Sequence, residues 1–319
     1  MFLAIEVGAT KLQLGIGTGD GAALIDLRRV DVEPAHGADG ICRQIQDIGT
    51  ELIRQHSVTA VGIGFGGPVD LSCGEVIQSH QIDGWDRFPL VSWAESTLAR
   101  PVCLGNDAVM AGLGEALFGA GRGEPAVLYS NVGSGIGGAL IINGVSFLGG
   151  SRGAQEIGHL RPGLHARTAD QSVESLASGW GLTQVAIERL NNSAHEHPGA
   201  VSDLLARCNG DTDKLDTKIL AHAMASGNEL ATDVFRQGIR VYGWALAQAI
   251  TLAGPNLVVV GGGVALVGET LYLAPLRQEI ERYVFPPRLG TYQVKAAELG
   301  EEVVLHGALA LARQTHGTD

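Results

Sequence analysis

Two stretches of this chain share one pattern: an apolar strand, a turn of small residues and a second apolar strand. The first copy spans residues 3–16 and turns at residues 8–11, and the second spans residues 127–142 and turns at residues 132–138. A turn with so few side chains lets backbone N–H groups approach an anion closely, and phosphate is the obvious candidate. Two such turns in the two halves of one chain predict a duplicated fold that holds one polyphosphate group between its halves.

A plain hairpin explains either glycine-rich turn when that turn is considered alone. Short glycine motifs match by chance, and a hairpin needs only small residues between two apolar strands. The presence of both turns at equivalent positions favours a functional role over this alternative.

The composition indicates a globular protein without a nucleic-acid-binding surface. Its 319 residues are enough for two domains with sizeable cores, and 45% of them are hydrophobic and 18% charged. The formal net charge of −12 argues against non-specific nucleic-acid binding, which needs Lys and Arg to displace counterions. A phosphorylated ligand must therefore be held by local donors and a metal ion.

The cysteine spacing, the N-terminus and two long uncharged stretches bear on the cellular compartment of the protein and on whether it spans a membrane. The four cysteines lie far apart and form no CxxC pair, which predicts isolated thiols in a reducing compartment, the cytoplasm. No basic region precedes the first apolar residues, as a signal peptide would require. Glycines interrupt the uncharged residues 126–151 and 244–268, which favours buried strands and helices over membrane spans of about 20 apolar residues.

Strands alternate with helices in both halves, which predicts an α/β fold with a mostly parallel sheet in each half. The predicted strands lie at residues 3–16, 22–32, 58–65, 102–104, 126–142, 145–148, 256–260 and 293–294. The predicted helices lie at residues 40–55, 92–98, 108–118, 181–190, 201–208, 215–225, 228–253, 271–284 and 303–313. The predicted domains are residues 1–115 and 116–302, with a terminal helix at about residues 303–319 that packs back on the first domain.

Asn106 and Asp107 stand where a predicted strand ends and a helix begins, the edge at which α/β proteins usually bind ligands. A carboxylate there can accept the proton of an attacking hydroxyl group while the neighbouring amide holds that hydroxyl. Capping of a helix is the commoner role of such an aspartate, and spacing alone favours it.

Three further features contain groups that can bind a ligand. Glu156 and His159 share one face if helical, where they suit a metal ion or a polyhydroxylated ligand, although a solvated surface pair is commoner. Glu174 fits an exposed helix position. The apolar residues 257–260 run into three glycines at residues 261–263, which suits close approach of a flat or phosphorylated ligand or a plain turn.

Together these motifs resemble the ROK family of sugar kinases and sugar-responsive repressors, and the match runs nearly from end to end. The matching segments are residues 6–11 and 132–138 (the two phosphate motifs), 62–70 and 84–85 (the sugar side), 106–108 (the catalytic motif), 114–123 (the segment that joins the halves), 156–159 (the sugar-binding motif) and 261–263 (the adenosine motif). The resemblance implies a duplicated actin/hexokinase-like (ribonuclease H-like) fold, with two domains around a central cleft. It also implies a cytoplasmic, homodimeric kinase that uses ATP and Mg²⁺.

By the same resemblance, Asp107 is the general base that takes the proton from a sugar hydroxyl group. The residues implied to bind the sugar with it are Gly67, Asn106, Glu156, His159 and Glu174. The residues implied to line the nucleotide are Gly8, Ala9, Thr10, Lys11, Gly133, Ser134, Gly135, Gly261, Gly262 and Gly263. Glu6 is implied to act on Mg²⁺ through a water molecule. Phosphoryl transfer needs mainly positioning and charge stabilisation, which one base, one metal ion and backbone turns can supply.

Several positions depart from the family pattern. Glu6 stands where the family usually has Asp, so one extra methylene can displace a magnesium-bound water. Gly66, Gln81 and Gln155 replace a usual Pro, Asn and Gly in regions where sugar specificity would be set. Many members carry a CxCGxxGCxE zinc segment after the sugar-binding motif, whereas residues 160–173 contain no cysteine, so we expect no zinc site. No helix–turn–helix precedes the first phosphate motif, which argues against the repressor branch.

Two functions follow from this resemblance. The first is ATP-dependent phosphorylation of glucose, a related aldohexose or an N-acetylhexosamine at the 6-hydroxyl group, with no nucleic-acid or membrane partner. The second is a non-catalytic sugar sensor that has lost efficient transfer, which Glu6 and the missing zinc segment favour. The set of sugar-binding residues and Asp107 favour the enzyme, which we expect. The sequence leaves polyphosphate open as an alternative donor.

Overall fold

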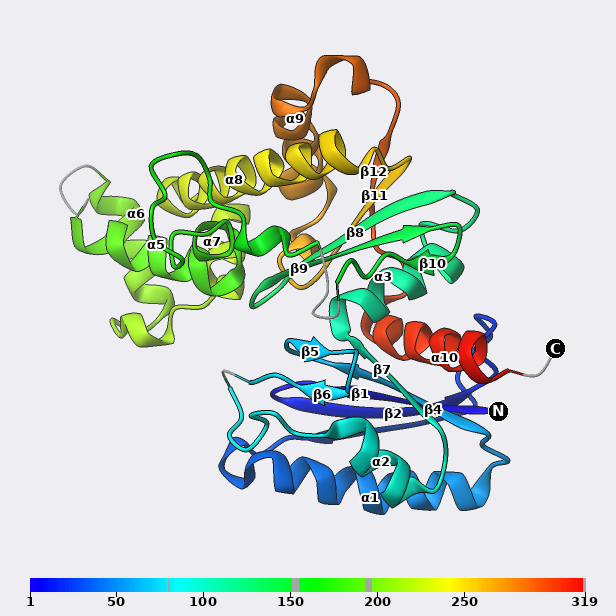
Figure 1. Cartoon of the computed structure of the whole chain (residues 1–319). Coiled ribbons are helices and arrows are strands. Elements are labelled where there is room, and N and C mark those ends of the chain that lie inside the picture. Colours follow the sequence, from blue (N-terminus) through cyan, green and yellow to red (C-terminus); the bar gives the residue numbers. More distant parts are fainter. Residues whose placement is uncertain (80, 151–154, 193–196, 318–319) are drawn as a thin grey trace. The chain divides into compact units, whose positions relative to one another are not determined.

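The two halves of the chain each form a five-stranded mixed sheet with the same strand order (Figure 1). The computed structural model describes residues 1–79, 81–150, 155–192 and 197–317. The first sheet has the order β3-β2-β1-β4-β7 and the second β10-β9-β8-β11-β12. In the first sheet the pairs β1–β2 and β2–β3 are antiparallel, and the pairs β1–β4 and β4–β7 are parallel. In the second sheet β9 and β10 pair antiparallel, and β11 and β12 pair parallel. The predicted duplicated α/β fold is confirmed.

The strands mostly fall where the apolar pattern predicts them. The first sheet contains β1 (Phe2–Val7), β2 (Lys11–Gly17), β3 (Asp26–Asp31), β4 (Ala60–Phe65) and β7 (Val102–Asn106). The second contains β8 (Ala126–Val132), β9 (Ile136–Ile142), β10 (Val145–Ser146), β11 (Leu257–Gly261) and β12 (Gln293–Ala296). A short hairpin of β5 (Val69–Asp70) and β6 (Glu75–Val76) was not predicted, because two-residue strands leave no alternation to detect.

The helices differ from their predicted bounds by a few residues at their ends, except for the four-residue α4 (Glu174–Ala177), for which no helix was predicted. They are α1 (Gly37–Gln55), α2 (Leu90–Leu98), α3 (Asp107–Phe118), α4 (Glu174–Ala177), α5 (Gly179–Asn192), α6 (Pro198–Arg207), α7 (Thr217–Ala225), α8 (Glu229–Ala253), α9 (Ala274–Tyr283) and α10 (Val303–His316). Capping sets several of these ends: the Asn228 side chain accepts from the Ala231 N–H at 2.9 Å and so starts α8 one residue after the predicted position.

Contacts divide the chain into two compact units. Unit 1 contains Met1–Tyr129, Ala139–Ala154 and Ala297–Asp319, and unit 2 contains Ser130–Gly138 and Gln155–Ala296. The expected boundary after residue 115 thus falls inside α3, within unit 1. The terminal helix α10 also belongs to unit 1, and residues 318–319 of the expected terminal segment lie outside the described residues.

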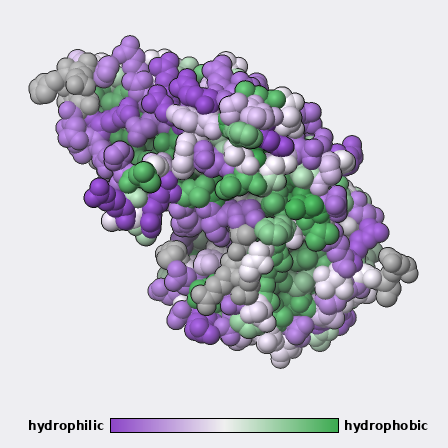
Figure 2. Space-filling model, turned by 45° about the horizontal axis from the view of Figure 1, so that its top comes forward, coloured by the Kyte–Doolittle hydropathy of each residue, from purple (hydrophilic) through white to green (hydrophobic). Residues whose placement is uncertain are grey.

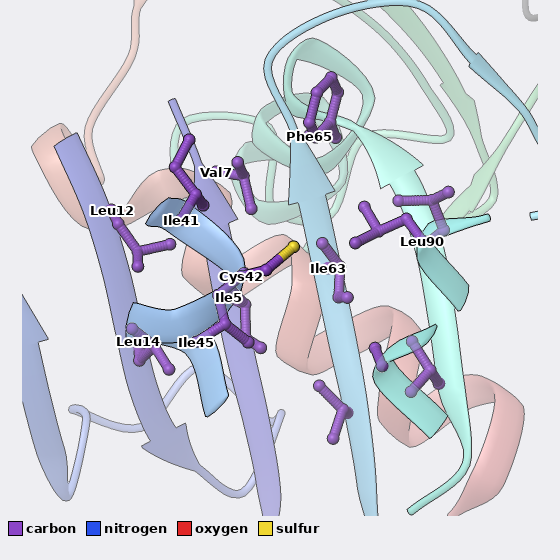
Figure 3. Packing of buried hydrophobic residues seen from close by; sticks show 14 of the residues in the cluster. Ile5, Val7, Leu12, Leu14, Ile41, Cys42, Ile45, Ile63, Phe65 and Leu90 are labelled. Carbon is purple, nitrogen blue, oxygen red and sulfur yellow. The ribbon is translucent and has the colours of Figure 1, made fainter. Parts of the chain in front are cut away.

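The core of unit 1 lies between its sheet and α1 with α2. Ile5 of β1 and Ile63 of β4 are fully buried beside Ile41 and Ile45 of α1 (Figure 3). These positions alternate along the strands and recur every three or four residues along the helix, so each element presents one apolar face. Burial of each such side chain contributes roughly 1.5–3 kcal/mol, which fixes the strands whose ends carry the predicted site.

Helix α10 covers the opposite face of the same sheet and packs against β1 and β4 (Figure 1). Small residues permit this packing: a Cβ atom on Gly62 would overlap the carbonyl oxygen of Ala308, and one on Gly307 would overlap that of Met110. Because Met110 belongs to α3, these contacts bring α3 and α10 together and set the position of Asp107 at the start of α3.

The surface carries mostly hydrophilic side chains on the face shown in Figure 2, with apolar residues gathered in patches among them. Within the described part of the chain, no helix combines the length and apolar character needed to cross a membrane.

Candidate active site

Three predicted motifs of unit 1 meet at the carboxyl ends of its parallel strands. Val7 of β1 pairs with Phe65 of β4, and Phe65 pairs with Asn106 of β7, so the loops that follow share one edge of the sheet. The Gly66 N–H donates to the Val7 carbonyl at 2.8 Å. A Cβ atom on Gly66 would lie 3.5 Å from Asp107 Oδ2, so the carboxylate of α3 comes close to this loop.

Asn106 caps the helix that Asp107 begins. The Asn106 Oδ1 atom accepts from the Ala108 N–H at 2.9 Å, and its Nδ2 atom donates to the Gly67 carbonyl at 3.0 Å. Asp107 Oδ1 accepts from the same Ala108 N–H at 2.8 Å. The capping role that spacing favoured is therefore present and is shared by both residues. Asn106 also fixes Gly67, the predicted sugar-loop residue, whereas its own contact to a sugar remains a prediction.

Glu6 lies in a hydrogen-bonded network that the sequence analysis missed. Gln13 sits opposite Glu6 in the β1–β2 register, is fully buried, and donates from Nε2 to Glu6 Oε2 at 2.5 Å. The same Nε2 donates to the Glu301 carbonyl at 3.1 Å, and Gln13 Oε1 accepts from Arg29 Nε at 2.6 Å. Arg29 also pairs with Glu302 at 3.0 Å.

Burial raises the pKa of the Glu6 carboxyl group, and the hydrogen bond from Gln13 and the charge of Lys11 partly oppose this shift. The nearby Asp107 carboxylate adds a smaller upward contribution to the pKa of Glu6. Two carboxylates thus act on each other at the carboxyl edge of the first sheet, where a cation can stabilise both.

The first predicted phosphate turn is a tight connection between β1 and β2. The Gly8 N–H donates to the Lys11 carbonyl at 3.1 Å, and the Thr10 carbonyl accepts from the Val32 N–H at 3.0 Å. Lys11 Nζ lies 3.3 Å from Glu301 Oε2 in a solvent-exposed ion pair. Ala9, Thr10 and the Gly8 backbone therefore form the surface of the turn, as the sequence pattern predicts for a hairpin.

The donor set of unit 1 fits Mg²⁺ rather than a metal with its own protein cage. Glu6 supplies carboxylate oxygens, the ligand type that Mg²⁺ prefers, and Mg²⁺ usually binds through one or two carboxylates together with waters and substrate phosphates. Within the described ranges, no three or more His, Cys, Asp or Glu residues gather as a metal cluster.

Unit 2 contains a pocket of about 820 Å³ beside the second predicted phosphate turn. Its volume lies in the range of about 300–1,000 Å³ that is typical of small-molecule sites. Of the predicted nucleotide residues in this unit, Gly133, Ser134 and Gly263 line the pocket. The other lining residues include Trp180, Thr183, Gln184, Leu215, Asp216, Thr217, Lys218, His222, Leu266 and Leu271, which the sequence analysis did not identify.

The remaining predicted glycines of unit 2 shape the backbone next to the pocket. Gly262 has φ +90°, and a Cβ atom there would overlap the Val132 carbonyl, so the strand end and the phosphate turn meet backbone to backbone. Gly261 ends β11 and is buried. Gly135 faces Glu174 instead, since its Cβ atom would lie 2.7 Å from Glu174 Oε2.

The predicted sugar segment forms a single short turn. Glu156 precedes the 3-10 helix η2 (Ile157–His159), and its carbonyl accepts from the His159 N–H at 3.0 Å. Residues three apart lie above one another in a 3-10 helix, so Glu156 and His159 share one side, and both are exposed. The preceding Gln155, where glycine is usual, adopts φ +62°, a conformation that favours glycine.

Known proteins match this chain in sequence and in structure over nearly its whole length. A model of the ROK family matches residues 2–315. The glucokinase of Streptomyces coelicolor is 32% identical, with 98% of this chain and 97% of that protein aligned. The glucokinase of Thermotoga maritima is 29% identical over 99% of this chain and 98% of its own length. The crystal structure of a ROK family glucokinase from Streptomyces griseus in complex with glucose and AMPPNP has a TM-score of 0.80 at 33% identity, covering 98% of this chain and 99% of that chain.

Proposed function

Because the chain belongs to the ROK family and is a sugar kinase, we propose that it transfers the γ-phosphoryl group of ATP to the 6-hydroxyl group of a glucose-like hexose. The observation that carries the proposal is the pocket of unit 2, which is of nucleotide size and bordered by Gly133 and Ser134 of a phosphate turn. The similarity to two glucokinases supports an aldohexose as acceptor, and an N-acetylhexosamine remains the related alternative.

In the proposed mechanism Asp107 is the general base. It takes the proton of the sugar hydroxyl group as the oxygen attacks the γ-phosphorus and the bond from that phosphorus to the leaving ADP breaks. A general base in such a role typically contributes 10²–10⁴-fold to the rate. Gly67, Asn106, Glu156, His159 and Glu174 hydrogen-bond the sugar ring and align that hydroxyl group. Alignment matters because phosphoryl transfer depends mainly on positioning and charge stabilisation.

The phosphates are proposed to lie against the two glycine-rich turns. The N–H groups of Ser134 and Gly135 and those of Ala9 and Thr10 act as donors, since backbone amides in such turns suit phosphate oxygens. Mg²⁺, when bound with the nucleotide, offsets the negative charge of the phosphates. Glu6 would act on this ion through a water molecule, and the hydrogen bond from Gln13 holds the Glu6 carboxylate.

Several pocket residues favour a nucleotide over inorganic polyphosphate as the donor. Trp180, Leu266 and Leu271 present apolar surface to the pocket, which suits a purine base. Among the described residues that line it, Lys218 is the only Lys or Arg, so the pocket lacks the row of cations that a long polyanion needs.

The test is the rate of phosphorylation of a hexose panel with MgATP by the wild type and by Asp107→Asn. We expect the variant to lose on the order of 10²-fold or more in kcat, because the base is removed while the shape is kept. The matched control is Asp47→Asn on the exposed face of α1, which should leave kcat unchanged. Undiminished turnover by Asp107→Asn would show that another group is the base, and sugar binding without turnover by the wild type would favour the sensor.

Cytoplasmic location and a homodimer are part of the same proposal; the first is supported by the isolated cysteines and the family resemblance, and the second by the resemblance alone. Sedimentation should then give twice the chain mass of 33.2 kDa.

A further inference from the structure

Both backbone groups of Ile136 contact residues from the proposed sugar side of unit 2. The Ile136 N–H donates to Glu174 Oε2 at 2.7 Å. On its other side, a Cβ atom on Gly158 would overlap the Ile136 carbonyl oxygen, so the turn Ile157–His159 packs directly on this residue. Ile136 is also the first residue of β9 and lies within the phosphate turn of residues 132–138, and it therefore joins the two proposed ligand-binding segments.

The segment from Glu174 to Gly179 holds both ends of the phosphate turn. Glu174 accepts from Ile136 at one end, and the Gly179 N–H donates to the Gly133 carbonyl at 2.7 Å at the other. The residues next to this segment and to the sugar turn are also bonded, because the Val173 N–H donates to the Leu160 carbonyl at 2.8 Å. A shift of Glu174 is thus transmitted to the turn by direct hydrogen bonds.

Glycine at position 135 is what lets the carboxylate approach. An added Cβ atom at Gly135 would lie 2.7 Å from Glu174 Oε2, closer than real Cβ contacts. The half-buried Glu174 uses Oε2 for the turn, which leaves Oε1 as the oxygen that can meet a sugar hydroxyl group.

We propose that Glu174 is a positioning residue that couples sugar binding to nucleotide binding, an inference that rests on the proposed function. A sugar held by Oε1 fixes the carboxylate, and Oε2 then holds the Ile136 N–H and the phosphate turn in the arrangement that binds the nucleotide. By linkage, each ligand raises the affinity of the other by the same factor.

The experiment measures the dissociation constant of glucose, and then of the other panel hexoses, with and without a saturating non-hydrolysable ATP analogue and Mg²⁺. The ratio of the two constants is the coupling factor, which for linked sites is typically about 5–150. We expect a factor in this range for the wild type and for the control Glu188→Ala, which changes an exposed carboxylate on α5. Glu174→Ala should bring the factor close to 1.

Two further variants separate coupling from a general loss of structure. Glu174→Gln keeps an acceptor for the Ile136 N–H and should keep the coupling factor, even where the hexose binds more weakly. Gly135→Ala displaces the carboxylate from the turn and should lower the factor as Glu174→Ala does, so it serves as the test if Glu174→Ala does not fold. Faster amide exchange over residues 133–138 should accompany each loss of coupling.

A wild-type coupling factor in Glu174→Ala or Gly135→Ala, or a factor near 1 in the wild type, overturns the inference alone. Failure of the wild type to bind any hexose contradicts the proposed function, and the inference falls with it.

Discussion

Gln13 stands out among the single residues because it is a fully buried amide between two buried leucines of β2. Its amide donates to Glu6 and to the Glu301 carbonyl and accepts from Arg29. These bonds give the longer Glu6 side chain a fixed position where the family usually has Asp. We therefore expect Glu6, despite its extra methylene, to be compatible with an active kinase.

Replacement of Gln13 by Met should destabilise the protein and weaken catalysis together. Met has a similar length but no donor for Glu6, and a buried carboxylate that loses its partner costs about 1–3 kcal/mol in the free energy of unfolding. Urea unfolding measures this cost, and the exposed Gln46→Met on α1 is the control. Equal free energies of unfolding for the two variants would show that the Gln13 bonds contribute nothing.

Among the elements, the end of α3 and the segment that leads into α10 depend on one buried carboxylate. Glu115 is fully buried, and its Oε1 accepts from the N–H groups of Glu298 and Leu299, each at 2.8 Å. Its Oε2 accepts from the Ala120 N–H at 2.9 Å. Three backbone donors from two distant segments thus share one side chain, which explains a charged residue inside unit 1.

Glu115→Gln should cost about 2 kcal/mol or more, because an NH₂ group replaces one acceptor and leaves at least one buried N–H unpaired. Hydrogen exchange of the backbone N–H groups of residues 120, 298 and 299 should be faster in this variant than in the wild type. The exposed Glu188→Gln provides the reference for simple charge removal. Unchanged exchange at these three amides would mean that the carboxylate is not what orders the two segments.

Helix α10 also carries a buried imidazole that should make stability depend on pH. His306 packs against Phe118 with ring centroids 6.3 Å apart, and burial lowers the pKa of its imidazole from 6.5. Between the lowered pKa of the folded state and pH 6.5 the unfolded chain binds a proton that the folded chain does not, so the free energy of unfolding falls as the pH drops through this range. Above pH 6.5 the imidazole of His306 is neutral in both the folded and the unfolded chain, so it no longer makes the free energy of unfolding depend on pH.

His306→Gln should flatten the pH dependence of stability below pH 6.5. Urea midpoints between pH 5 and 8 measure it, with His316→Gln at the end of the same helix as the control. The same slope for His306→Gln and the wild type would contradict the assignment of the pH dependence to His306.

For the whole molecule, sequence periodicity was enough to predict two α/β halves and the order of most elements. It could not predict the pocket of unit 2, because Trp180, Lys218 and Leu271 come from segments far apart in the chain and carry no shared local pattern. The Gln13–Glu6 pair was detectable in principle, since a lone amide between two leucines lies opposite Glu6 in a hairpin register. The Glu174–Ile136 bond depends on tertiary packing and left no signal in the sequence.

The central claim is that this chain phosphorylates a hexose with ATP, and the most direct measurement identifies the product. The purified protein is incubated with MgATP and each hexose in turn, and NMR locates the phosphate on the sugar while ADP is quantified. The account predicts a hexose 6-phosphate formed in equal amount with ADP. A folded protein that binds a hexose but yields neither ADP nor a sugar phosphate with any member of the panel would contradict it.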